Sequence, residues 1–105
     1  MPSIIEQLEQ FVKDDPGDPF SKYALALEYQ KVNVHKALTL FNTLLVEHEN
    51  YVPTYYHLGK LYQQEGDPEM AVRTFDKGIE VARRANDHKT LKELQSARES
   101  LLFDN

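Results

Sequence analysis

The sequence predicts an all-α fold, a stack of antiparallel helical hairpins with about six helices. Three observations lead to this prediction. The segment 23–29 (Tyr-Ala-Leu-Ala-Leu-Glu-Tyr) returns at 56–62 (Tyr-His-Leu-Gly-Lys-Leu-Tyr), an offset of 33 residues. The spacing Ala-x-x-x-Phe at 37–41 returns at 71–75, an offset of 34 residues. Self-similarity at such a period indicates stacked helical units, and no stretch alternates apolar and polar residues long enough to predict a strand.

The first helix is predicted over residues 3–14. Ser3 followed by Glu6 has the spacing of a capping box. Ile4, Leu8 and Phe11 then recur at helical spacing and give one apolar stripe. The segment 14–19, with two prolines and a glycine, cannot continue the helix.

The first repeat is predicted over residues 19–51. Asp18 before Pro19 suits a helix start, and apolar residues on more than one face extend this helix to about Val32. Asn33 interrupts the pattern, and a second helix continues to about His48. A helix that is apolar on two sides is expected to pack on two sides.

The second repeat is predicted over residues 52–85. Pro53 opens a helix that runs to Gln64, and the turn at 66–68 (Gly-Asp-Pro) separates it from a helix over 69–85. Asn86 and Asp87 are expected to cap a last helix, so that the final element spans 87–103. The whole chain, 1–105, is expected to form one domain.

Composition excludes several classes of function. The net charge is −5, so a nucleic-acid partner is not expected. The sequence has no cysteine, which excludes disulfides and cysteine-ligated zinc. No window has the length and apolar content of a signal peptide or a membrane span, so a cytoplasmic protein without membrane contact is the expectation.

These motifs resemble the tetratricopeptide repeat (TPR) family, whose signature has the form W-x₂-L-G-x₂-Y, A-x₃-F and P. In the second copy the corresponding residues are Tyr55, Leu58-Gly59, Tyr62, Ala71 and Phe75. In the first copy they are Leu25-Ala26, Tyr29, Ala37 and Phe41. Small residues at Ala26 and Gly59 would let the second helix of each hairpin approach closely. Lys22 stands where a large apolar residue is usual.

The resemblance implies a right-handed solenoid. Helix 3–14 looks like the second half of a repeat, and helix 87–103 looks like a capping helix. It also implies a non-catalytic adaptor or scaffold that binds a partner protein or peptide on a concave face formed by the first helices. The residues that would line this face are Phe20, Tyr23, Leu27, Gln30, Tyr56, Lys60 and Gln63. Tyr23 and Tyr56 have a second interpretation, in which they only pack between repeats with their hydroxyls in water.

The clamp with which one TPR subclass holds a carboxylate is absent. Tyr23, Leu27 and His57 occupy positions where that clamp would have lysine and asparagine, so a chaperone tail is not expected as ligand and Lys60 is the only cation expected in the groove. The four histidines lack ligand spacing and no catalytic or phosphate-binding motif is present, so we expect no metal, no cofactor and no enzyme activity.

Two alternatives stay open. With two full repeats, fewer than the roughly three that such arrays usually need, the chain could self-assemble, for example as a homodimer. It could also be the regulatory subunit of an enzyme. Basic residues around Arg83 and Arg84 are interpreted as solvated helix surface interleaved with acids, with an acidic partner segment as the alternative.

Overall fold

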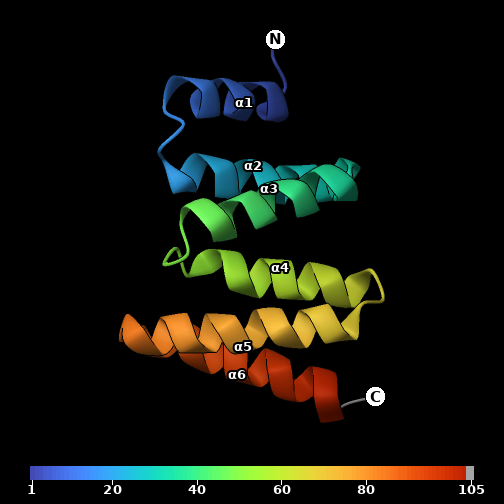
Figure 1. Cartoon of the computed structure of the whole chain (residues 1–105). Helices are drawn as coiled ribbons and strands as arrows, with labels where there is room; N and C mark the ends of the chain where they lie inside the picture. The colour runs from blue at the N-terminus through green and yellow to red at the C-terminus, as the bar shows by residue number, and fades with distance from the viewer. Residues whose placement is uncertain (104–105) are drawn as a thin grey trace. The chain divides into compact units, whose positions relative to one another are not determined.

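Figure 1 shows a computed structural model of the chain, in which residues 1–103 are described. They form six helices and no strand, so the predicted all-α fold with about six helices is confirmed. The helices are α1 (Ile4–Asp14), α2 (Pro19–Val32), α3 (Val34–Glu47), α4 (Pro53–Gln64), α5 (Pro68–Arg84) and α6 (His88–Phe103).

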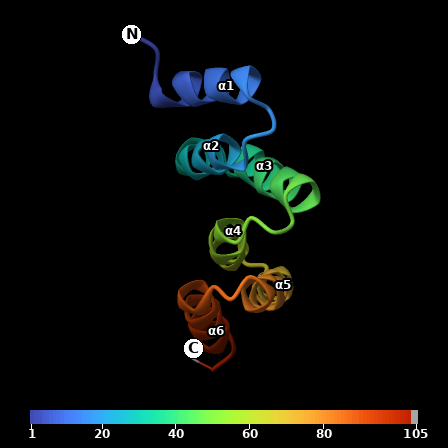
Figure 2. The same cartoon turned by 90° about the vertical axis from the view of Figure 1, so that its left-hand side faces the viewer.

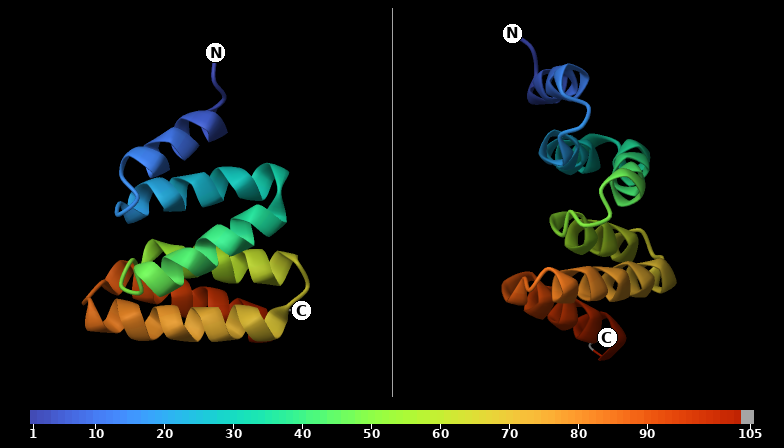
Figure 3. Two further views of the ribbon diagram at one scale, coloured as in Figure 1. Left: turned by 45° about the horizontal axis from the view of Figure 1, so that its top comes forward. Right: turned by 60° about the vertical axis from the view of Figure 1, so that its left-hand side comes forward.

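The helices belong to two compact units, divided between Tyr51 and Val52. In the first unit α2 and α3 form an antiparallel hairpin and α1 packs on α2 (Figure 3). In the second unit α4 and α5 form the hairpin, and α6 lies against both of them (Figure 2). The division falls at the boundary expected between the two repeats, and a single domain over 1–105 stays a prediction.

Side-chain caps that the sequence motifs predict fix the starts of α1 and α2, whereas α4, preceded by Val52, has no side-chain cap. Ser3 Oγ accepts a hydrogen bond from the Glu6 backbone N–H at 3.1 Å, and Glu6 Oε1 accepts one from the Ser3 N–H at 3.2 Å. Asp18 accepts bonds from the Phe20 N–H and the Ser21 hydroxyl, and these bonds, that of Ser21 first, lower the pKa of its carboxyl group. Each cap satisfies backbone N–H groups that a helix start leaves unpaired.

Two helices of the second unit end in the same way. Gly66 after α4 and Asn86 after α5 have φ angles of 79° and 56°. The next residues, Asp67 and Asp87, donate their backbone N–H groups to the carbonyls of Tyr62 and Ala82, as in a Schellman motif. Asn86 therefore closes α5, and Asp87 alone caps α6, by accepting from the Thr90 N–H. The prediction that both residues cap the last helix needs this correction.

Close packing in the second unit depends on two glycines. A Cβ atom on Gly59 would lie 2.3 Å from the Phe75 ring, and one on Gly78 would lie 2.5 Å from Tyr55 Cβ. Phe75 and Tyr55 are almost fully buried. The aromatic rings thus fill the volume that the missing side chains leave, as the small residue of the motif predicts.

The first unit fills the equivalent volume differently. Ala26, Ala37 and Phe41 are fully buried in it. Lys22 replaces the aromatic residue Tyr55, and Leu44 replaces Gly78, so at these positions the first unit has a larger residue on α3 and a thinner one on α2. The two hairpins therefore keep one fold with opposite distributions of bulk.

Candidate functional site

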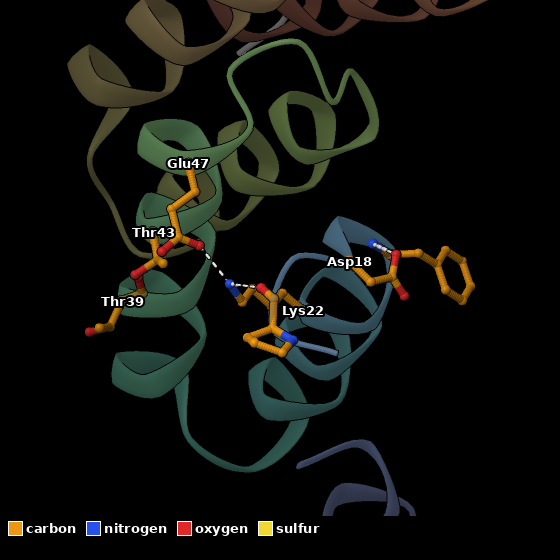
Figure 4. Close-up of polar contacts among 7 residues, drawn as sticks. Asp18, Lys22, Thr39, Thr43 and Glu47 are labelled. Carbon is orange, nitrogen blue, oxygen red and sulfur yellow. Dashed lines mark hydrogen bonds and ion pairs between the residues drawn. The ribbon is translucent and has the colours of Figure 1, made fainter. Parts of the chain in front are cut away.

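The buried lysine of the first unit is a structural residue rather than part of a binding surface. Lys22 is only 8% exposed. Its Nζ atom donates to the Pro16 carbonyl at 2.7 Å and to Glu47 Oε1 at 2.6 Å (Figure 4). The bond from Lys22 lowers the pKa of the Glu47 carboxyl group. These contacts join α2 to α3 and to the turn that precedes α2.

The predicted face of α2 is partly covered. Phe20 is 60% exposed, whereas Tyr23, Leu27 and Gln30 are half-buried. The Tyr23 ring lies edge-on to the Tyr51 ring, with centroids 5.7 Å apart. Burial first, and then the electrostatic effect of the neighbouring Tyr51, raise the pKa of the Tyr23 hydroxyl, so it stays protonated and can donate at neutral pH.

The predicted face of α4 lies beside a groove of the second unit. Tyr56, Lys60 and Gln63 are all half-buried. A groove of about 420 Å³ runs between α4 and α6. The residues that line it are Tyr56, Lys60, Lys92, Glu93, Ser96, Ala97 and Ser100. The structure therefore brings two of the three predicted α4 residues together, and Gln63 is not among the lining residues.

The two predicted glutamines share an unusual feature. Gln30 and Gln63 hold equivalent positions in the two repeats, 33 residues apart. The Oε1 atom of each is buried and accepts no hydrogen bond from the described residues. Neither amide oxygen is therefore offered at the surface in this structure.

The α6 side of the groove contains residues that sequence reasoning missed. Lys92 is a second cation in the groove between α4 and α6. The expectation that Lys60 is the only cation concerned the face of the first helices and stays a prediction. Helix α6 lacks the repeat motif. Its resemblance to a capping helix gives no reason to expect binding residues on the side that lies against α4. A signal was nevertheless present, because Lys92, Ser96 and Ser100 recur every fourth residue and so share one face of a helix.

His57 lies behind this surface on α4. Its ring meets the Tyr56 ring edge-on, with centroids 5.4 Å apart. Burial lowers the pKa of the imidazole, and the nearby Glu93 carboxylate raises it by a smaller amount. The side chain is therefore neutral at pH 7 and adds no charge to the groove.

Two cations of the predicted basic patch have an acidic neighbour, and so does Arg98 on α6. Arg84 and Lys77 lie 3.9 and 3.8 Å from Glu80 oxygens, and Arg98 pairs with Asp76. A groove of about 600 Å³ between α5 and α6 is lined by both charge signs. This arrangement agrees with the interpretation of the patch as solvated helix surface.

The part of the chain that the structure describes contains no group of three or more histidine, aspartate or glutamate side chains that could hold a metal ion. It also contains no helix with the length and apolar character that crossing a membrane requires.

Comparisons with known proteins identify the family. A tetratricopeptide repeat model matches residues 52–84. The crystal structure of a tetratricopeptide repeat domain protein from Salinibacter ruber is 45% identical; the match covers 84% of this chain and all of that one, with a TM-score of 0.79. The chain belongs to the TPR family. Members of this family typically act as interaction modules for other proteins.

Two further solved structures resemble this TPR protein. The solution NMR structure of a TPR domain protein from Salinibacter ruber is 46% identical, with coverage of 87% and 93% and a TM-score of 0.82. A solution structure from Bordetella parapertussis is 25% identical, with coverage of 96% and 89% and a TM-score of 0.82. No curated protein matches the chain. The family predicted from the repeated motifs is thus confirmed.

Proposed function

We propose that this TPR protein is a non-catalytic adaptor that binds a short segment of another protein on the concave face expected of its first helices, α2 and α4. The observation that carries the proposal is the groove between α4 and α6, lined by Tyr56 and Lys60, two residues already expected to contact a partner. An aromatic ring beside a cation is a frequent composition of contact surfaces. Phe20 and Tyr23 supply the corresponding aromatic side chains on α2.

Affinity capture from the source cell tests this proposal. A partner retained by the wild-type chain should be lost when Tyr23 and Tyr56 are both changed to alanine, because each substitution removes an aromatic contact without changing the charge. The matched control is Phe103→Ala, since Phe103 is an aromatic residue 75% exposed outside the predicted face. Circular dichroism should show unchanged helicity in both variants. A partner that the double variant retains would show that these faces are not the binding surface.

Self-association is a second candidate, favoured by α1. No residue of α1 is buried, and Ile4 and Phe11 of its apolar stripe are 53% and 56% exposed. A second copy could cover this stripe. Sedimentation equilibrium should then show a mass that rises with concentration in the wild type and stays monomeric in an Ile4→Gln, Phe11→Gln variant. A wild-type monomer at every concentration would dismiss this candidate.

A further inference from the structure

The groove between α4 and α6 differs from the rest of the second unit in its charges. Lys60 and Lys92, one on each wall, make no ion pair with any residue in 1–103. Arg98, by contrast, pairs with Asp76 on the other side of α6. The one carboxylate among the lining residues is Glu93. Its charge also raises the pKa of His57, by less than burial lowers it. The groove is thus lined by two cations and one carboxylate, an excess of one positive charge. Lys92 also borders the groove between α5 and α6, where Asp76 and Glu99 are among the lining residues.

The remaining lining residues suit a carboxylate-bearing chain. The hydroxyls of Tyr56 and Ser96 can donate hydrogen bonds to an anionic oxygen. Ala97 is buried and supplies a small apolar floor, so a backbone can lie close to α6. A hydrogen bond in which one group is charged is stronger than a neutral one, and two cations on opposite walls can hold two acidic side chains.

The net charge of −5 helps to direct an acidic segment to this groove rather than to the rest of the surface. An acidic segment is repelled by most of the surface of an acidic protein and attracted where unpaired lysines gather. We propose that the partner segment bound in this groove carries aspartate or glutamate side chains, held by Lys60 and Lys92. This inference rests on the proposed function, because it names the chemistry of the segment that the adaptor would bind.

Selection from a library of random peptides of about ten residues, displayed on phage and presented to the immobilised full chain, tests the inference. The wild type should enrich peptides in aspartate and glutamate relative to the starting library. A Lys60→Glu, Lys92→Glu variant should lose this preference and enrich lysine and arginine. A selected acidic peptide should bind this variant at least about tenfold more weakly than the wild type, with a loss that shrinks as salt is added.

The matched control reverses two exposed cations of the same unit outside the groove, Arg73→Glu with Lys89→Glu, and has the same net charge as the first variant. It should keep the acidic preference and bind the peptide within about twofold of the wild type. Acidic enrichment that survives in the Lys60 and Lys92 variant would overturn the inference. Selected peptides without acidic enrichment would overturn it and leave the proposed function intact, whereas selection of no peptide at all would overturn both.

Discussion

At the scale of single residues, Lys22 shows how one position can keep a fold while changing its chemistry. Its equivalent in the second repeat is Tyr55, a buried aromatic. Lys22 keeps its aliphatic stem in the same interior and carries its ammonium group to the Pro16 carbonyl and to Glu47. The sequence shows the departure, but not the partners, because Pro16 and Glu47 come from a turn and from the end of another helix.

Replacing Lys22 tests this interpretation. Lys22→Ala should lower the free energy of unfolding by about 1–2 kcal/mol, since it removes buried methylene groups and the hydrogen bond to the Pro16 carbonyl. Lys22→Met should cost less, because methionine refills most of the volume. Urea denaturation at pH 7 measures both. Equal losses in the two variants would show that packing of the stem contributes nothing.

The same residue predicts a dependence on pH. Because Lys22 holds the pKa of Glu47 below its ordinary value of 4.5, the pair adds stability above that value and loses it as the pH falls through the lowered pKa. Denaturation is therefore measured at a series of pH values below about 5. The free energy of unfolding should depend less steeply on pH in Lys22→Met than in the wild type. Identical pH slopes would contradict the assigned contact.

At the scale of elements, the helix boundaries follow from short motifs that could be read in the sequence. Ser3, Asp18 and Asp67 cap helices because their side chains can accept bonds from N–H groups two or three residues on. The role of Asn86 was less predictable, since asparagine suits both a helix start and a left-handed helix end. Only the backbone geometry decides between these roles, and here φ is 56°.

Hairpin packing is tested most directly at Gly59. Gly59→Ala should lower the free energy of unfolding by about 1–2 kcal/mol, because the clash with the buried Phe75 ring outweighs the better helix propensity of alanine. Thermal denaturation of the variant measures the loss. Gly17→Ala is the control, since a Cβ atom there would meet only Asp15 Oδ1, at 3.9 Å. A Gly59 variant as stable as the wild type would contradict the close approach of α4 and α5.

At the scale of the whole molecule, the sequence predicted the fold and family better than the site. Repetition identifies packing residues, because equivalent positions pack in the same way in each repeat. The residues that we propose to contact a partner differ between repeats, as Leu27 and Lys60 do, and the period does not point to them. Lys92 lay outside both repeats, so its place beside Lys60 became visible only once α6 was seen against α4.

The first helices, α2 and α4, are proposed to form the binding surface. Two-dimensional NMR of the full chain, titrated with the partner segment recovered by affinity capture, shows directly which amides change chemical shift on binding. The largest amide shifts should fall on α2 around Tyr23 and Leu27, on α4 around Tyr56 and Lys60, and on α6 around Lys92. Amide shifts on α3 and α5, with none on α2 and α4, would contradict the proposed binding surface.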